Sequence, residues 1–250
     1  MKKKLVAAIA CRNKGSRLYG KPLQNLDEKK GVRIIDNIID HLKRIDIIDE
    51  IVLGISDGVE NDLYIDIAKE KEIYFIRGNE KDVLKRLIDC GDKVSATDIF
   101  RITSESPFMY YQSINSLWEL YKKNGLDAIF QDDIIDGCGF EIISLKALKI
   151  SHERGEERHR SEFCTLYIRE NPNEFNIEKI KANKELDRKD LRLTVDNPED
   201  LIICKELYNA FSDQAPQFNV YDLISYLDNN PRLKNLVSKY TQEGYETMYI

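Results

Sequence analysis

The N-terminal stretch of residues 5–23, LVAAIACRNKGSRLYGKPL, decides the fold that we expect. Its first six residues are apolar without alternation, which is typical of a short strand buried on both faces of a sheet. The residues that follow combine two glycines with four basic side chains, Arg12, Lys14, Arg17 and Lys21. Clustered cations repel one another unless they are solvated or hold an anion, and glycine lets the backbone approach a ligand. Because open α/β sheets bind phosphates directly after the first strand, the stretch predicts a phosphate site.

Three other interpretations of this stretch compete with a phosphate site. Residues 2–11 loosely imitate a lipoprotein signal, but the apolar segment 5–10 is shorter than a secretory signal needs, and charges follow at once. Residues 15–21 fit the G-x-x-x-x-G-K pattern of a Walker A loop, yet Pro22 stands where that loop needs a hydroxyl group for magnesium. An ordinary solvated turn stays open on composition alone.

The order of the residues in 12–23 favours a ligand-binding loop over a plain turn. The pattern R-x-x-x-S-R-L-x-x-K-P-L behind a buried strand resembles the signature loop of the CTP-dependent sugar nucleotidyltransferases. That group includes the CMP-Kdo and CMP-sialic acid synthetases, and the resemblance is strongest for the spore-coat polysaccharide cytidylyltransferases. It implies that three cations are catalytic: Arg12, Arg17 and Lys21. It also implies nucleotide-binding residues along the strand and the loop: Ala8, Ala10, Gly15 and Ser16.

Length and composition limit the possible classes of protein. At 250 residues the chain is long enough for one large α/β domain, and we expect a single domain over residues 1–250. A net charge of -6 argues against general nucleic-acid binding. No apolar run approaches the length of a membrane span, so we expect no membrane insertion. The five cysteines are scattered without a C-x-x-C pair, which favours reduced thiols in a cytoplasmic protein over disulfides or a zinc site.

Strand-like and helix-like segments alternate over the first half of the chain. Apolar runs predict strands over residues 51–55, 73–76, 99–103 and 128–130. Amphipathic spacing predicts helices over residues 34–45, 61–71, 80–94 and 114–123. This alternation predicts a Rossmann-like open α/β fold, with a largely parallel sheet and helices on both faces. The resemblance implies the nucleotide-diphospho-sugar transferase version of that fold, whose ligands bind at the carboxyl ends of the strands.

The segment 77–84, RGNEKDVL, follows the predicted strand 73–76. Acidic side chains favour the first turn of a helix, so a plain helix start would by itself explain Glu80 and Asp82. The segment also resembles the R-G-x-x-x-D-V-L stretch of the spore-coat cytidylyltransferases. That resemblance implies that Arg77 and Asp82 contact the nucleotide.

The segment 101–107, RITSESP, follows the next predicted strand. It is similar to the family pattern R-x-T-G-D-x-P, whose aspartate holds magnesium beside the triphosphate. Glu105 replaces that aspartate and is one methylene longer, and magnesium tolerates little displacement of its ligands. The resemblance therefore implies that Glu105 is a magnesium ligand, with a contact through water or a loss of activity as the alternatives.

The segment 191–201, LRLTVDNPEDL, is the second specific match. We expect a strand that ends at Asp196 and a helix that begins at Pro198, because proline and acidic residues favour helix starts. Helix capping would by itself explain Asp196 or Asn197. However, the pattern L-T-V-D-x-P-E-D-L resembles the family element that supplies a magnesium ligand, which implies that Asp196 holds Mg²⁺.

The middle of the chain, residues 131–183, breaks the alternation of strands and helices. Asp132, Asp133 and Asp136 suggest a metal site, but turns are equally rich in aspartate. The resemblance implies that this region is an extended arm that binds the acceptor and forms a dimer.

Within that region, the run D-G-x-G-x-E resembles the segment that lines the acceptor-sugar pocket of the family. It implies that Glu141, together with Gln131, contacts the acceptor. Residues 152–160 are highly charged, which is typical of a solvated helix face. A loose similarity to an R-E-H element of the family instead implies that Arg158 and His159 hold an anionic sugar.

Taken together, the resemblance implies a homodimeric cytidylyltransferase that uses Mg²⁺ as its cofactor. It would transfer CMP from CTP to a sugar acid or a related acceptor, with release of pyrophosphate, in the synthesis of a cell-surface polysaccharide or glycoconjugate. Two alternatives stay open. One is another enzyme on the same sheet, such as a nucleotidyltransferase for a different nucleotide or a phosphate-bearing acceptor. The other is a nucleotide-binding relative without catalysis, which Ser104 and Glu105 motivate.

Overall fold

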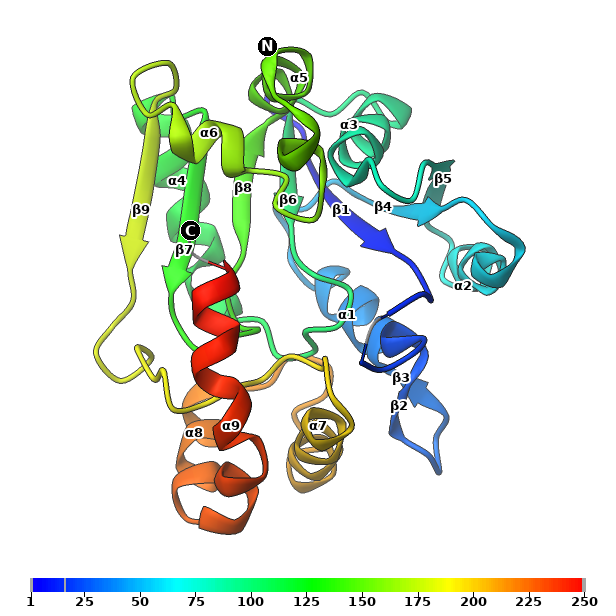
Figure 1. Cartoon of the computed structure of the whole chain (residues 1–250), viewed down its shortest axis with the longest axis vertical. Helices are drawn as coiled ribbons and strands as arrows, with labels where there is room; N and C mark the ends of the chain where they lie inside the picture. Colours follow the sequence, from blue (N-terminus) through cyan, green and yellow to red (C-terminus); the bar gives the residue numbers. More distant parts are fainter. Residues whose placement is uncertain (1, 16, 249–250) are drawn as a thin grey trace.

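Seven strands from both halves of the chain form one sheet, in the order β5-β4-β1-β6-β8-β7-β9 (Figure 1). The computed structural model describes residues 2–15 and 17–248. The parallel half of the sheet consists of β1 (Leu5–Cys11), β4 (Glu50–Ser56), β5 (Tyr74–Gly78) and β6 (Asp98–Arg101). The other half consists of β7 (Ala128–Asp133), β8 (Glu141–Ser144) and β9 (Ile177–Lys181). Of these three, β8 runs antiparallel to both of its neighbours, and β7 and β9 run parallel to each other.

Helices cover the sheet on both sides, as the alternation predicts. One core cluster contains residues of α1 (Ile34–Leu42), α2 (Leu63–Glu70), α4 (Ile114–Asn124), α7 (Pro198–Ala210), α8 (Val220–Asp228) and α9 (Pro231–Met248). The second cluster contains residues of α3 (Val83–Lys93), α5 (Leu145–Arg154) and α6 (Leu166–Glu170). β1 separates the two clusters, because Leu5, Ala7 and Ile9 belong to the first while Val6 and Ala8 belong to the second. The predicted α/β fold class is therefore confirmed.

Short elements connect these layers. After β1 come η1 (Lys21–Leu23) and a small hairpin of β2 (Asn25–Asp27) and β3 (Val32–Arg33). The remaining 3₁₀ turns are η2 (Val59–Asn61), η3 (Tyr111–Ser113) and η4 (Glu157–Arg160). Among the helices in the described part of the chain, none is long and apolar enough to cross a membrane.

The region 131–183 differs from the extended arm that we expected. Its residues form the end of β7, all of β8 and β9, and α5 and α6, which pack against the second core cluster. The cause is burial, because the side chains of β8 are almost fully buried, and a strand with this pattern needs a place inside the sheet. The charged stretch 152–160 is likewise not one helix, since α5 ends at Arg154 and η4 follows.

The segment before α7 also differs from its prediction. Residues 191–196 are mostly buried but form only one isolated bridge, between Asp136 and Arg192, instead of a strand. Their backbone N–H groups pair with loops, since Leu193 donates to the carbonyl of Asp136 and Val195 donates to the carbonyl of Glu105. The segment thus crosses beneath the ends of β6 and β7 and leads into the predicted helix at Pro198.

Candidate active site

A cavity of about 720 Å³ lies at the carboxyl ends of the parallel strands, where ligands of open α/β sheets bind. Its walls come from the loop after β1, the end of β6, the β7–β8 turn, the segment before α6 and residues 192–196. The described residues that line it include eight basic side chains but only six acidic ones. The whole chain carries a net charge of -6. The excess of positive charge at the cavity therefore favours an anionic ligand there.

The loop after β1 brings its cations to one end of the cavity. At Gly15 a Cβ atom would lie 2.4 Å from the carbonyl oxygen of Leu18, so the tight fold of this loop requires glycine. Gly20 has a φ of 58° and is the N-cap of η1, whose first residue, Lys21, lines the cavity. Arg12 contacts Glu162 at 3.3 Å across the cavity. Ser16, predicted to bind the nucleotide, lies outside the described residues.

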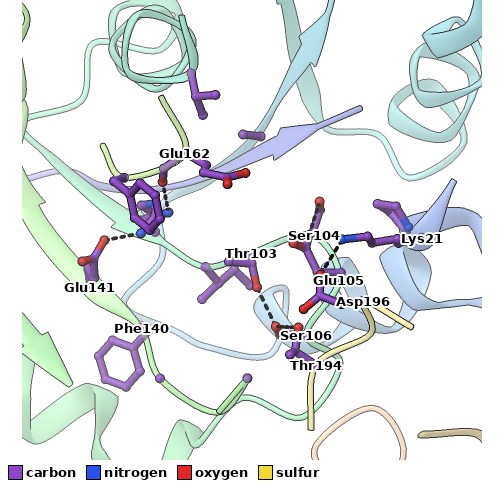
Figure 2. Close-up of a pocket in the computed structure, with 18 of the residues that line it drawn as sticks. Lys21, Thr103, Ser104, Glu105, Ser106, Phe140, Glu141, Glu162, Thr194 and Asp196 are labelled. Atoms are coloured by element: carbon purple, nitrogen blue, oxygen red, sulfur yellow. Dashed lines mark hydrogen bonds and ion pairs between the residues drawn. The ribbon is translucent and has the colours of Figure 1, made fainter. Parts of the chain in front are cut away.

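Asp196 is the acidic partner of this loop (Figure 2). Its Oδ1 atom lies 2.5 Å from the Nζ atom of Lys21 and 3.4 Å from a guanidinium nitrogen of Arg17. Its Oδ2 atom accepts a hydrogen bond from Arg192. Burial opposes ionisation, but Lys21, Arg192 and Arg17 together lower the pKa of Asp196, so this carboxyl is charged.

Helix capping does not account for Asp196. The N-cap of α7 is Asn197, and the carboxylate of Asp200 accepts hydrogen bonds from the backbone N–H groups of Asn197 and Asp196 at 2.7 and 2.9 Å. Because Asp200 satisfies the helix start, the side chain of Asp196 is left to face the cavity.

Glu105 lies beside Asp196 at the end of the loop that follows β6 (Figure 2). Its carboxylate accepts a hydrogen bond from the Ser104 hydroxyl at 3.0 Å. Burial raises the pKa of Glu105; Lys21 lowers it and the charge of Asp196 raises it further. A chain of hydroxyl groups on Thr103, Ser106 and Thr194 holds the same two segments together.

The donor chemistry of Asp196 and Glu105 suits a magnesium ion. Both supply hard carboxylate oxygens, and magnesium is commonly held by one or two carboxylates together with substrate phosphates and water. The ammonium group of Lys21 lies against Oδ1 of Asp196, so this oxygen atom already contacts a positive charge. Within residues 2–15 and 17–248, no group of three or more His, Cys, Asp or Glu side chains is arranged to hold a metal by itself.

The opposite end of the cavity contains a network of buried charges around Glu141. Its carboxylate accepts hydrogen bonds from Arg101 at 2.6 Å, from Arg169 at 2.7 Å and from the Thr165 hydroxyl at 2.8 Å. Burial opposes ionisation, but Arg101 and Arg169 lower the pKa of Glu141 to about 2. Gln131, also predicted to contact the acceptor, lines the same cavity and accepts a hydrogen bond from Ser113.

Asp132 and Asp133 at the end of β7 and Asp136 in the following turn are not arranged as a group of ligands that could hold a metal ion, so the structure does not support the metal interpretation of these residues. Arg169 pairs with both carboxylate oxygens of Asp132, and Arg192 pairs with Asp136. Two of the three carboxylates that a metal ion would need are therefore already paired with arginine.

The cavity brings together only part of the predicted site. The predicted residues that line the cavity are Arg12, Arg17, Lys21, Ala10, Gly15, Glu105, Asp196, Gln131 and Glu141. Ala8 does not, because its side chain is buried in the second core cluster. Asp82 caps α3 and contacts His152 at 2.8 Å. Arg77 pairs with Asp62 at 2.6 Å and donates to the carbonyl of Gly58.

Arg158 and His159 also lie outside the cavity lining. Arg158 is exposed and pairs with Glu170 at 2.6 and 2.8 Å. His159 is buried, and its two ring nitrogens contact Glu156 and Glu170. Both residues therefore have structural partners on η4 and α6, and a role in binding the acceptor stays a prediction.

Sequence reasoning missed four arginines that line the cavity: Arg86, Arg101, Arg169 and Arg192. Arg101 and Arg192 stand within the recognised segments 101–107 and 191–201, so their motifs could have identified them. Arg86 follows the segment 77–84 and donates to the carbonyls of Cys11 and Gly54 at the ends of β1 and β4. No sequence motif around Arg169 indicates its place in the site, because its partners Asp132 and Glu141 are distant in sequence.

A basic loop after β1 that meets two carboxylates at one end of a cavity, at the carboxyl ends of the strands of an open α/β sheet, is the arrangement of a nucleotidyltransferase. Comparison with known proteins specifies this class further. Residues 6–241 match the sequence model of the cytidylyltransferases, and the chain belongs to that family. The recognition from sequence is therefore confirmed.

Individual proteins are similar to this chain over most of its length. An uncharacterised protein of Methanocaldococcus jannaschii is 28% identical over 97% of this chain and 98% of its own. The spore coat polysaccharide biosynthesis protein SpsF of Bacillus subtilis is 25% identical, over 89% of this chain and 93% of its own. A solved cytidylyltransferase of Leptospira borgpetersenii has a TM-score of 0.83 at 22% identity, covering 93% of this chain and 97% of that one. A solved CMP-2-keto-3-deoxy-manno-octonic acid synthetase in complex with CTP has a TM-score of 0.63 at 14% identity, covering 83% and 99%.

Proposed function

We propose that the protein transfers CMP from CTP to a sugar acid or a related acceptor and releases pyrophosphate. The observation that carries this proposal is the meeting of Arg17 and Lys21 with Asp196 at one end of the cavity, with a separate polar network at the other end. The first end suits a triphosphate and the second suits a hydroxyl-rich acceptor. The name of the Bacillus subtilis relative supports a role in the synthesis of a cell-surface polysaccharide or glycoconjugate.

The reaction requires positioning more than covalent chemistry by the protein. An oxygen atom of the acceptor attacks the α-phosphorus of CTP, a new P–O bond forms, and the bond to the β-phosphate oxygen breaks. Pyrophosphate carries the electron pair away, and the proton of the attacking hydroxyl group is released to solvent or to the pyrophosphate. Lys21, Arg17 and Arg12 stabilise the negative charge that develops on the leaving oxygens, because they lie on one loop beside the cavity.

Mg²⁺ is the proposed cofactor, held by Asp196 together with Glu105 and the phosphates of the substrate. When bound, it would neutralise triphosphate charge and orient the phosphates for in-line attack. Binding of the ion at Asp196 Oδ1 requires Lys21, which contacts this oxygen atom in the structure, to move towards the phosphates of the substrate.

The acceptor is proposed to bind between Gln131 and Glu141. Arg101 and Arg169 keep Glu141 ionised, so its carboxylate is available as a hydrogen-bond acceptor for hydroxyl groups of the sugar. Phe140, next to Glu141, adds an apolar surface to the same end of the cavity (Figure 2).

We further propose a cytoplasmic homodimer. The five cysteines are buried free thiols, as expected in a reducing compartment. Size-exclusion chromatography with light scattering would measure the mass in solution, and a mass near that of one chain, 29.1 kDa, would contradict the dimer.

The decisive experiment is pyrophosphate release by the purified protein with CTP, ATP, GTP or UTP. Each nucleotide is supplied with Mg²⁺ and a panel of sugar acids, neutral sugars and sugar phosphates, with Asp196→Ala as the control. Release with CTP and one sugar acid, absent in the control, would support the proposal. Turnover with another nucleotide or only with a phosphate-bearing acceptor would contradict it in favour of that substrate.

A further inference from the structure

Arg192 is the centre of a cluster of carboxylates beneath the phosphate end of the cavity. Its guanidinium contacts three of them through three different nitrogen atoms: Nη1 with Asp136, Nε with Asp200 at 3.1 Å, and Nη2 with Asp196. The side chain of Arg192 is only 3% exposed. A guanidinium group has a rigid planar fork, so three simultaneous partners fix its orientation.

The three carboxylates differ in their access to the cavity. The side chains of Asp136 and Asp200 are 2% and 0% exposed, so they form a buried base for the guanidinium. Asp196 is 18% exposed and faces the cavity. Arg192 therefore links the two buried carboxylates to Asp196, the most exposed of the three, and limits the movement of its side chain.

The cations around Asp196 divide into two kinds. Lys21 and Arg17 approach Oδ1 from the loop after β1, and both line the cavity where the triphosphate is proposed to bind. Arg192 approaches Oδ2 from the buried side. When a triphosphate draws Lys21 and Arg17 towards itself, Arg192 is the cation that stays with Asp196.

We propose that Arg192 is a positioning residue for the transfer reaction. It holds Oδ2 of Asp196, presents Oδ1 to the proposed metal position, and keeps the carboxylate in place while Lys21 exchanges Asp196 for the substrate. The backbone adds to this arrangement, because Asp200 holds the N–H group of Asp196 at 2.9 Å. This inference rests on the proposed function, since it gives Asp196 the task of holding Mg²⁺.

The test compares three variants of the full chain. Arg192→Lys keeps the positive charge but loses the planar fork that contacts three carboxylates. Asp136→Asn removes the negative charge of one buried partner of Arg192 and leaves the side chain of Asp196 unchanged. Arg188→Gln is the matched control, because Arg188 also bridges two carboxylates, Asp190 and Asp228, but does not line the cavity.

Two measurements report on metal binding, and one of them is independent of turnover. Binding of Mn²⁺ in the presence of CTP is followed by electron paramagnetic resonance, and the Mg²⁺ concentration that gives half-maximal rate is determined at saturating CTP. We expect Arg192→Lys to raise both the Mn²⁺ dissociation constant and the half-maximal Mg²⁺ concentration by about tenfold or more. Asp136→Asn should shift both in the same direction by less, and Arg188→Gln should leave both unchanged. Melting temperatures establish that each variant is folded.

The possible outcomes separate this inference from the proposed function. Folded Arg192→Lys with wild-type Mn²⁺ affinity and Mg²⁺ dependence would overturn the positioning role while leaving the transfer reaction intact. If Arg192→Lys does not fold, Asp136→Asn decides, and an unchanged metal dependence in that variant overturns the role. If the wild-type protein binds CTP but no Mn²⁺, the metal assignment of Asp196 is wrong, and the role of Arg192 falls with it.

Discussion

Replacement of Lys21 by alanine tests the phosphate end of the cavity most directly. Lys21 begins η1, and its ammonium group lies 2.5 Å from Asp196 Oδ1, facing the space where the triphosphate is proposed to bind. The variant keeps the fold of the loop, because the turn depends on Gly15 and Gly20. Asp196 keeps Arg17 and Arg192 as partners, so no buried charge is left without compensation.

The size of the effect follows from the role proposed for this cation. One preorganised donor to the charge that develops in a transition state is worth about 3 kcal/mol. Since each 1.36 kcal/mol changes the rate about tenfold, Lys21→Ala should lower kcat on the order of a hundredfold. The melting temperature should change little, because the side chain belongs to no core cluster.

The assay is pyrophosphate release at saturating CTP, Mg²⁺ and acceptor, with thermal unfolding measured in parallel. Lys29→Ala is the matched control, since Lys29 is an exposed lysine between β2 and β3 that does not line the cavity. Turnover of Lys21→Ala close to that of Lys29→Ala would remove Lys21 from the mechanism. A loss of activity that only accompanies unfolding would equally refute the reasoning.

Three further predictions concern other residues of the cavity and its surroundings. Glu105→Ala should lower the rate at limiting Mg²⁺ by about tenfold while Glu105→Asp retains most of it, and equal Mg²⁺ titrations of both would refute a ligand role. Glu141→Gln should reduce stability at neutral pH by roughly 3 kcal/mol, because it removes the buried negative charge that compensates Arg101. The Glu141 carboxyl has a folded pKa of about 2 against 4.5 for a glutamate in the unfolded chain, so the wild type loses this stability as pH falls through that window. Acid-induced unfolding should therefore show a shallower slope for Glu141→Gln. Arg158→Ala should leave the acceptor KM within about twofold, because Arg158 pairs with Glu170 outside the cavity and exposed ion pairs contribute little; a tenfold rise would contradict this.

Local patterns predicted residues that the fold brings together at one end of the cavity. The apolar run of β1 and the order of residues around Lys21 are contiguous in sequence, and so is the element around Asp196. Each could therefore be recognised by itself. Their contact joins residues 175 positions apart, and it follows from the rule that the carboxyl ends of parallel strands share one edge of the sheet.

The acceptor end could not be predicted in the same way. Glu141 was identified from its motif, but the arginines that fix its charge come from β6 and α6, and no spacing in the sequence encodes that meeting. β8 was missed because it has only four residues and follows a turn with two glycines. Arg158 was predicted from its charge alone, and the fold supplies Glu170 as its partner, so its role in binding the acceptor stays a prediction.

The reversed direction of β8 has a consequence for how this enzyme can change its substrate. Because β8 runs against β7, a single turn delivers both Gln131 and Glu141 to the same edge of the sheet, and the N–H group of Gln131 closes that turn on the carbonyl of Phe140 at 3.1 Å. A parallel strand supplies its end to that edge only after a complete crossover. The proposed acceptor wall is therefore one short, contiguous segment, whereas the loop after β1 and the Asp196 segment lie elsewhere in the chain. Exchange of residues 131–141 between homologues that keep Asp136, the partner of Arg192, should thus alter the choice of acceptor without rebuilding the machinery proposed to cleave the nucleotide.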